Sequence, residues 1–393
     1  MIATIARVSM VAAMAWAATG SASAAVSQAR LAGLFDPANR TENFRQMDQI
    51  LPFRPIPTAT PMPLPRRLDT GPASYTWNGA TKPVEVFLRE NRVVAFIVVR
   101  KGVVVREWYG LGAGPQDRFT SWSMAKSVLS TLVGIALAEG RISSIDDPVK
   151  KYAPQFADTA YADVPLRDLL TMSSGIAWND DTKDPNSDTS KLLRAVYFQG
   201  DRAGAFVGRS PRRAPAGTVF NYGSADPQVL AAVLSNATGS ALSDYLSQKI
   251  WRPLGASAEG YWNLDRDGGA ELGACCISAR LDDYARFGAM LANGGAWRDR
   301  QVVPSEWIAA ASRPGRPGLE PGKLAGENGY GYLWWIPPSS QEEFFADGLF
   351  GQVLWIDQKH KTAVVMLADD VASDAHLAEE IALMRALTND AHH

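Results

Sequence analysis

Apolar residues along this chain follow two different periods, and each period predicts a different element. In the first third of the chain, "VVAFIVVRKGVVVREWYG" places β-branched runs on both sides of Lys101-Gly102, which predicts a β-hairpin with glycine in its turn. From residue 120 to residue 140 the apolar positions repeat on a helical period, with Ser and Thr at the start and Gly140 just past the end. This segment predicts a long, largely buried helix whose first turn contains Ser123.

The middle of the chain predicts short helices, and its end predicts strands. Between residues 142 and 326, loops rich in Pro, Gly and Asp interrupt the helical pattern, and the clearest predicted helices are residues 227–236, 242–249 and 278–292. After them, "GYLWWI", "FGQVLWID" and "TAVVMLAD" predict three successive strands, and residues 375–388 predict a closing amphipathic helix.

The order of these elements favours an α+β fold, because strands occur in consecutive runs rather than in alternation with helices. We predict an antiparallel sheet flanked by helices and completed by both ends of the chain, with a mainly helical domain inserted. The predicted sheet domain comprises residues 81–150 and 327–393, and the helical domain comprises residues 151–326. Residues 25–80 form an N-terminal extension with a short helix over residues 25–35 and a proline-rich strap, "LPFRPIPTATPMPLP".

The first residues have the pattern of a secretory signal peptide, residues 1–24. Arg7 precedes an apolar run over residues 8–18, and Ala22-Ser23-Ala24 supplies small residues for cleavage after Ala24. The alternative, a buried N-terminal helix, fits less well because the apolar run stops at small polar residues. No later segment is long and apolar enough to span a bilayer, so we predict a soluble bacterial protein that is exported to the periplasm or secreted.

Composition narrows the choice of partners. Of the 393 residues, 46% are hydrophobic, and 39 Lys and Arg against 41 Asp and Glu give a net charge of −2, so nothing favours nucleic acid or an anionic membrane. A small-molecule substrate is the better prediction, and the oligomeric state stays open.

The two cysteines, Cys275 and Cys276, are adjacent, where a disulfide is hard to form. We therefore expect neither a disulfide framework nor a cysteine-rich zinc site.

Histidine, the usual base of serine hydrolases, is scarce here. The sequence also lacks the G-x-S-x-G elbow, the H-E-x-x-H zinc motif and the P-loop. None of the four histidines lies in a setting typical of a catalytic triad; they are His360, His376, His392 and His393. A hydrolase with this sequence therefore needs another group to take the proton.

Ser123 and Lys126, in "SWSMAKS", offer such a pair. Three residues apart on a helix, they lie on one face, and burial of a lysine lowers its pKa toward neutrality. The free N–H groups of the first helical turn also suit a developing oxyanion. About one S-x-x-K is expected by chance in a chain of this length, so the pair by itself favours an ordinary helix start with an exposed lysine.

Two further stretches add polar groups that such a site requires. In "VFNYGSADPQVL", Tyr222 lies in a loop before a helix, where its hydroxyl can pass a proton to a leaving group, and Ser224 offers another donor. In "FFADGLFGQVLWID", Gly348 and Gly351 flank a strand entry where a substrate can approach backbone N–H groups. Packing of the tyrosine and a plain β-bulge at the glycines are the alternative interpretations.

Together, the three stretches resemble the S-x-x-K, Y-x-S/N and K/H-T-G elements of the serine β-lactamase and penicillin-binding-protein superfamily. The tyrosine in the second element resembles the class C branch and its esterase relatives. "LRDLLTMSSGI" and "CCISARLDDYARFGAML" resemble two further segments of the superfamily, with Met172 where histidine is usual, and the order fits over residues 85–390.

Within that superfamily the chain is most similar to the 6-aminohexanoate-dimer hydrolases and related carboxylesterases, through residues 123–127, 220–226 and 348–357. This resemblance implies a β-lactamase-like fold and a serine hydrolase without metal or cofactor. It implies that Ser123 is the nucleophile, Lys126 its base and Tyr222 the proton shuttle. The implied oxyanion hole consists of the N–H groups of Ser123 and Leu349.

The chain also departs from the superfamily pattern. Ala346 stands where class C enzymes carry a cation that holds a substrate carboxylate, and Asp347 replaces the following threonine, which argues against strong β-lactamase or carboxypeptidase activity. Leu272 stands where some nylon-oligomer hydrolases carry asparagine. The residues predicted to line a substrate pocket are Trp122, Trp178, Ser224, Gly348 and Gln352, with Tyr261, Trp262 and Trp334 as further aromatic candidates.

Three functions remain open at this point. The first is a hydrolase of small amides or esters that acts through an acyl-Ser123 intermediate. The second keeps this chemistry and changes the substrate to a β-lactam or to a D-alanyl-D-alanine peptide. The third is a binder of a cell-envelope ligand without catalytic activity, which the intact Ser, Lys and Tyr set disfavours.

Overall fold

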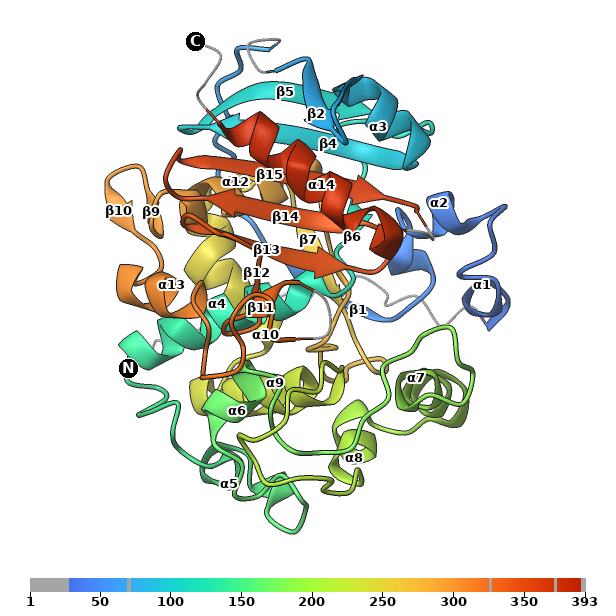
Figure 1. The fold of residues 1–393 in the computed structure, drawn as a ribbon. Coiled ribbons are helices and arrows are strands. Elements are labelled where there is room, and N and C mark those ends of the chain that lie inside the picture. The colour runs from blue at the N-terminus through green and yellow to red at the C-terminus, as the bar shows by residue number, and fades with distance from the viewer. Residues whose placement is uncertain (1–27, 69–71, 325–326, 371–372, 390–393) are drawn as a thin grey trace, which may run out of the picture.

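The computed structural model describes residues 28–68, 72–324, 327–370 and 373–389. The predicted signal peptide lies outside these residues, as do His392 and His393. At the centre is a seven-stranded antiparallel sheet in the order β11-β12-β13-β14-β15-β4-β5 (Figure 1). Its strands are β4 (Val93–Arg100), β5 (Val103–Tyr109), β11 (Gly329–Tyr330), β12 (Trp335–Ile336), β13 (Glu343–Gly348), β14 (Gln352–Asp357) and β15 (Thr362–Ala368). Because β15 pairs with β4, both ends of the chain complete one sheet, as the sequence predicts.

The predicted hairpin is present as β4 and β5. Arg100 pairs with Val103 across a two-residue turn in which Lys101 and Gly102 have φ values of 50° and 79°. Positive φ at both central positions is the geometry whose twist matches that of paired strands, and glycine adopts it without steric cost.

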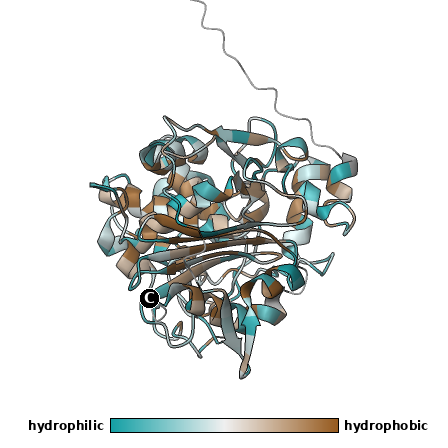
Figure 2. Ribbon diagram, turned by 90° about the horizontal axis from the view of Figure 1, so that it is seen from above, coloured by the Kyte–Doolittle hydropathy of each residue, from teal (hydrophilic) through white to brown (hydrophobic). Residues whose placement is uncertain are grey.

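Helices cover both faces of the sheet. One face packs against α3 (Val84–Glu90) and α14 (Ser373–Thr388), and the other against α4 (Met124–Ala138) and α12 (Leu281–Ala292). Alternate residues of β4 point to opposite faces, so Phe96 belongs to the first core and Ile97 to the second. Figure 2 shows the apolar strands in the middle of these layers, and the α+β class is confirmed.

Most of the short helices lie in the predicted helical domain. They are α5 (Val149–Tyr152), η2 (Pro154–Phe156), α6 (Leu166–Leu170), α7 (Asp188–Gln199), α8 (Ala203–Gly208), α9 (Ala225–Thr238), α10 (Leu242–Leu246), η3 (Ser247–Trp251), α11 (Arg252–Leu254) and α13 (Ser305–Ala311). Helices α5 to α9 lie below the sheet in the view of Figure 1, and the buried helix α4 contacts both β13 and α9. Helix α4 is therefore the element that joins the two parts, while the predicted domain boundaries stay a prediction.

A second, four-stranded sheet has the order β1-β7-β8-β6. Its strands are β1 (Phe53–Ile56), β6 (Phe119–Thr120), β7 (Gly260–Asn263) and β8 (Ile277–Ala279). The proline-rich strap supplies β1 and then runs to the edge of the main sheet, where Arg66 forms a bridge with Val104. The remaining elements are α1 (Gln28–Ala32), α2 (Arg40–Asn43), η1 (Met47–Gln49), β2 (Ser74–Trp77), β3 (Ala80–Pro83), β9 (Ala296–Trp297) and β10 (Arg300–Gln301).

Two element predictions are wrong in detail. The helix predicted over residues 278–292 begins at Leu281, because Ile277–Ala279 pairs as a strand with β6 and β7. The segment "GYLWWI", residues 331–336, is a strand only at Trp335–Ile336, which is β12. Its first residues, with Leu333 at a φ of 59°, form the bend between β11 and β12. The strand β13 was not predicted, because the acidic residues and glycine of "EFFADG" hide its buried apolar centre.

The interpretation that a disulfide between the two adjacent cysteines is hard to form is also wrong. Cys275 and Cys276 form a disulfide between adjacent residues, and Cys276 takes a φ of 76°. This left-handed conformation, which residues other than glycine rarely adopt, allows the chain to turn at the bond.

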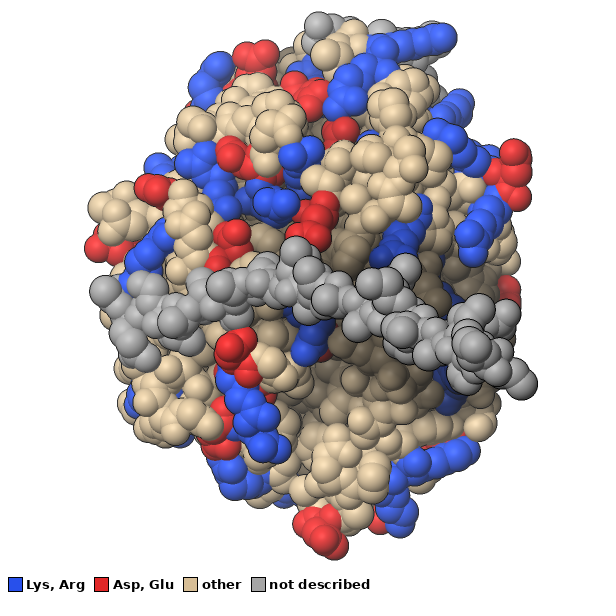
Figure 3. All heavy atoms as spheres, turned by 180° about the vertical axis from the view of Figure 1, so that it is seen from behind, with Lys and Arg blue, Asp and Glu red and all other residues tan. Residues whose placement is uncertain are grey.

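Charges on the surface are mixed. Figure 3 shows Lys and Arg interspersed with Asp and Glu over one face of the molecule. None of the helices in the described part of the chain combines the length and the hydropathy that a membrane span requires.

Candidate active site

Ser123 occupies the residue immediately before α4, and its side chain does not cap the helix. Its Oγ instead accepts a hydrogen bond from Nζ of Lys126 at 2.7 Å. The start of the helix puts residues three apart on one face, so the spacing in the sequence becomes a direct contact. The structure thus brings the predicted nucleophile and the predicted base together.

The Lys126 side chain is buried, at 2% exposure, beneath the first turn of α4. Burial lowers the pKa of its ammonium group from 10.5 to about 8, although the nearby carboxylates of Asp180 and Asp347 act in the opposite direction. At pH 7, about a tenth of such lysines are neutral, against roughly one in 3,000 for a lysine with the ordinary pKa. The site therefore supplies an amine that can accept a proton near neutral pH.

Tyr222 completes this group from the loop that precedes α9. Its ring centre lies 4.8 Å from Nζ of Lys126, and its hydroxyl interacts with the Ser123 side chain. Burial raises the pKa of the Tyr222 phenol above its ordinary value, so the hydroxyl keeps its proton. The rings of Tyr330 and Trp335, with centres 6.2 and 5.4 Å away, hold the Tyr222 ring.

The loop that carries Tyr222 packs against a second loop, which contains Trp178 and Asp180. A side chain at Gly223 would place its Cβ 2.6 Å from Cδ1 of Trp178, so only glycine fits there. Oδ1 of Asp180 accepts hydrogen bonds from the Ser224 N–H and the Trp178 Nε1–H, both at 3.0 Å, and from the Thr189 hydroxyl. Asp180 thus ties the two loops together. The sequence did not single it out, because it is one of several carboxylates in "WNDDTKD".

The end of β13 meets the residues before the nucleophile. A Cβ at Gly348 would lie 2.5 Å from the Ser121 carbonyl oxygen and 3.2 Å from the Ser123 nitrogen. Glycine is required there because the backbone of Ser121 to Ser123 approaches it closely, rather than because of a strand entry alone. Within the described residues, neither the Ser123 N–H nor the adjacent Leu349 N–H donates a hydrogen bond, so both remain available to an oxyanion.

The structure separates the residues predicted to line a substrate pocket. Trp178 and Ser224 lie in the two loops beside Tyr222. The Trp122 ring is buried against Phe44 and Phe350, with ring centres 5.0 and 6.3 Å away. All five aromatic candidates belong to the hydrophobic core, including Tyr261, Trp262 and Trp334.

Gln352 has a different setting from the other pocket candidates. Its Nε2 donates to the carbonyl oxygens of Leu349 and Ala368 at 3.0 and 2.8 Å. The side chain is buried and therefore braces the turn between β13 and β14, which carries the Leu349 N–H.

Carboxylates, rather than cations, surround the buried lysine. Asp180 and Asp347 are the charged groups that perturb the pKa values of both Lys126 and Tyr222, and Ala346 is a buried residue of β13. The described histidines lie elsewhere: His360 pairs with Asp357 and His376 pairs with Asp370. In the described part of the chain, no group of three or more His, Cys, Asp or Glu residues is placed to hold a metal ion.

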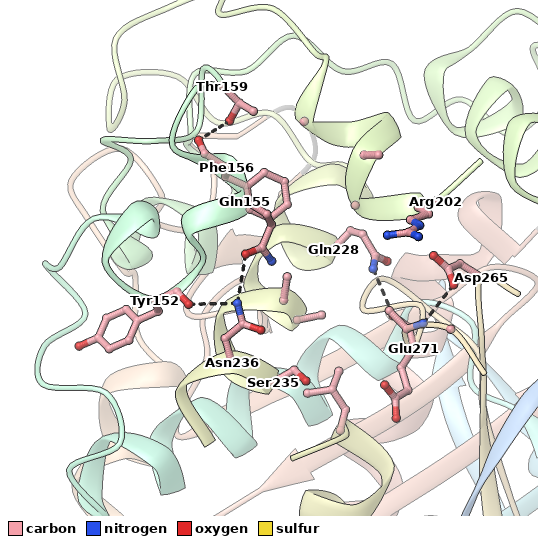
Figure 4. A pocket seen from close by; sticks show the side chains of 18 of the residues that line it. Tyr152, Gln155, Phe156, Thr159, Arg202, Gln228, Ser235, Asn236, Asp265 and Glu271 are labelled. Carbon is pink, nitrogen blue, oxygen red and sulfur yellow. Dashed lines mark hydrogen bonds between the residues drawn. The ribbon is translucent and has the colours of Figure 1, made fainter. Parts of the chain in front are cut away.

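An open groove of about 1490 Å³ lies beside α9, and Figure 4 shows it from close by. Its polar side chains bond to the protein itself: Nε2 of Gln228 donates to the Glu271 carbonyl oxygen, and Nδ2 of Asn236 donates to the Tyr152 carbonyl oxygen, both at 3.1 Å. The lining of the groove includes none of Ser123, Lys126 and Tyr222. Its size therefore does not make it the site of the predicted chemistry.

The arrangement around Ser123 matches the requirements of acyl transfer: a hydroxyl, a buried amine bonded to it, a phenol and two free N–H groups. Known hydrolases are similar to this chain in sequence. The sequence model of the beta-lactamase family matches residues 84–388. A 6-aminohexanoate-dimer hydrolase of Paenarthrobacter ureafaciens is 30% identical over 295 residues, which cover 72% of this chain and 74% of that protein.

Solved structures share the fold. A putative 6-aminohexanoate-dimer hydrolase from Bacillus anthracis superimposes with a TM-score of 0.79 at 22% identity, over 91% of this chain and 97% of that one. A family VIII carboxylesterase superimposes with a TM-score of 0.58 at 17% identity, over 77% of this chain and 95% of that one. The predicted β-lactamase-like fold is confirmed.

Proposed function

The chain belongs to the beta-lactamase family, and on that premise we propose that it cleaves small amides or esters through an acyl intermediate on Ser123. Membership of this family makes the chain a serine hydrolase; the roles of individual residues and the substrate are the proposal. The contact that carries the proposal is the 2.7 Å hydrogen bond from a buried Lys126 to Ser123. A lysine that binds its proton weakly beside a hydroxyl is the arrangement that activates a serine.

The proposed reaction has two halves. Neutral Lys126 takes the proton of Ser123 as Oγ attacks the substrate carbonyl, and the N–H groups of Ser123 and Leu349 bind the oxyanion. Tyr222 donates its proton to the leaving amine or alcohol and regains one from Lys126. In the second half, water loses a proton to the same groups, attacks the acyl carbon and releases the acid, which restores the Ser123 hydroxyl.

Two observations support an ester or amide rather than a β-lactam as the substrate. A relative at 30% identity is named a 6-aminohexanoate-dimer hydrolase, and a structural neighbour is a carboxylesterase. The second observation is electrostatic: Asp347 lies near Lys126 at the end of β13, where a carboxylate repels the carboxylate that a penicillin carries.

We also propose that the protein is exported. The signal-peptide pattern of residues 1–24 supports this, and so does the Cys275–Cys276 disulfide, because disulfides persist in oxidising compartments such as the periplasm.

Intact mass after incubation with three compounds tests the proposed substrate class. p-Nitrophenyl butyrate and the 6-aminohexanoate dimer should each add their acyl group to the wild-type protein and none to Ser123→Ala, while benzylpenicillin should add nothing. A stable penicilloyl adduct on Ser123 would move the assignment to β-lactams. Equal acylation of the Ser123→Ala variant would overturn the nucleophile.

A further inference from the structure

The peptide that joins Trp122 to Ser123 has two polar ends. One end is the Ser123 N–H, a proposed oxyanion donor, and the other is the Trp122 carbonyl oxygen. A peptide is planar and trans, so its N–H and C=O point in opposite directions. Contacts that fix the Trp122 carbonyl therefore also aim the Ser123 N–H.

Three donors hold the Trp122 carbonyl oxygen. They are the Ser121 hydroxyl at 3.0 Å, the Ala125 N–H at 3.2 Å and the Cys276 N–H at 3.4 Å. The Ala125 bond belongs to the first turn of α4, whereas the Cys276 bond comes from a segment more than 150 residues away in sequence. Trp122 itself has a φ of 41°, which residues with a side chain rarely adopt without support from their surroundings.

The Cys276 N–H is held in place by the bonds of its own loop. The Cys275 N–H donates to the Leu272 carbonyl at 3.2 Å, and the Trp262 indole donates to the Cys275 carbonyl at 2.9 Å. The disulfide closes a small ring across the peptide between the two cysteines, so the φ of 76° at Cys276 is held by a covalent bond.

Residues 275–277 also act on the Trp122 carbonyl indirectly, through hydrogen bonds to Ser121. The Ser121 N–H donates to the Ile277 carbonyl at 2.7 Å, and the Ile277 N–H donates to the Ser121 hydroxyl at 3.0 Å. That hydroxyl in turn donates to the Trp122 carbonyl. Residues 275–277 therefore fix one carbonyl both directly and through Ser121.

We propose that the Cys275–Cys276 disulfide is a positioning element that, with Ser121, holds the Trp122–Ser123 peptide so that the Ser123 N–H faces the oxyanion. This inference rests on the proposed function, in which Ser123 is the acylated residue. The intact disulfide is then a condition for rapid acylation, although neither sulfur touches the substrate.

A dithiol can test this directly. Dithiothreitol transfers two electrons and two protons, so that it becomes a cyclic disulfide while Cys275 and Cys276 become thiols. Cys275 is only partly buried, which gives the reductant access. Because the chain contains two cysteines in all, the reagent has no other disulfide in the protein to act on.

The experiment follows the release of p-nitrophenolate in the pre-steady state, with oxidised and reduced wild-type protein and with a Cys275→Ser/Cys276→Ser variant. Loss of one oxyanion donor lowers the rate by about 10²- to 10³-fold. A Ser123 N–H that no longer faces the oxyanion should therefore slow acylation by at least about tenfold. The substrate dissociation constant, taken from the concentration dependence of the burst rate, should change by less than about twofold, because the substrate-binding contacts are untouched. Titration of two thiols verifies reduction, and reoxidation should restore the rate.

Controls separate the possible causes. The serine variant should match the reduced enzyme and ignore dithiothreitol, and Ser121→Ala should slow acylation in the oxidised enzyme while adding little to the effect of reduction. An unchanged acylation rate in the reduced enzyme would overturn the inference. A rate loss that follows the melting temperature and raises the substrate dissociation constant equally would show a merely structural role. Activity retained in Ser123→Ala would instead overturn the proposed function.

Discussion

At the scale of single residues, Lys126 is subject to two opposing effects. Burial disfavours its charged form more strongly than the carboxylates of Asp180 and Asp347 favour it, so the net result is a pKa of about 8. Because the neutral amine is the active base, kcat/KM for p-nitrophenyl butyrate should rise with pH through an apparent pKa of about 8. A flat profile from about pH 6 to about pH 9 would contradict this role.

A substitution at Asp180 tests in which direction this pH profile shifts when a nearby negative charge is removed. Its negative charge raises the pKa of Lys126, so Asp180→Asn should lower that pKa and move the rising limb toward lower pH. Asp158→Asn, which changes an exposed carboxylate, is the matched control and should leave the limb in place. A shift of the limb to higher pH in Asp180→Asn would show that its hydrogen bonds to Trp178 and Ser224 outweigh its charge.

The contribution of Tyr222 to the rate should depend on the leaving group of the substrate. Tyr222→Phe keeps the ring beside Trp335 and removes the hydroxyl that interacts with Ser123. Amide cleavage, in which the amine must be protonated, should fall by about 10²-fold or more, because general acid catalysis contributes that much. p-Nitrophenolate leaves without a proton, so ester cleavage should fall less. Equal losses for both substrates, measured as kcat/KM, which reports acylation, would contradict a proton-donor role.

At the scale of elements, the contact between β13 and the start of α4 determines the geometry of the two N–H groups. Gly348→Ala would place a methyl group 2.5 Å from the Ser121 carbonyl oxygen, so the strand end must move away from Ser123. A displacement of about 1 Å costs about 10²-fold in rate, and we expect a loss of that order in kcat with the fold retained. Gly114→Ala is the control, because its Cβ would meet open space. Full activity in Gly348→Ala would rule out this contact as a determinant.

Elements that form through a regular apolar period were predictable, and those that form through distant pairing were not. The β4–β5 hairpin and α4 follow from local pattern and turn chemistry. Strand β8 has three residues, and its pairing with β6 and β7 overrides the helical pattern that continues into α12. The Cys275–Cys276 disulfide was missed for a related reason, since a left-handed residue at Cys276 is not visible in the sequence.

At the scale of the whole molecule, the site is assembled from segments that are far apart in the chain. Ser123 and Lys126 come from the start of α4, Tyr222 from the loop before α9, and Leu349 from the turn after β13. The resemblance to a family predicted these residues together. It did not predict Asp180 or the cysteine pair, because their effect depends on loop packing that the motifs do not contain.

The proposed export can be tested on a protein that carries residues 1–24. Expression of residues 1–393 in a Gram-negative host should give a periplasmic protein whose N-terminus is Ala25 and whose mass corresponds to an oxidised cysteine pair. A full-length, reduced protein confined to the cytoplasm would contradict both parts of this prediction.

The most direct test of the central claim, acylation of Ser123 with Lys126 as its base, is a pre-steady-state burst with p-nitrophenyl butyrate. The account predicts a burst of about one p-nitrophenolate per wild-type molecule, followed by slower turnover. The burst should be absent in Ser123→Ala and strongly slowed in Lys126→Ala, while both variants keep the wild-type circular dichroism spectrum. A full burst in a folded Ser123→Ala variant would contradict the account.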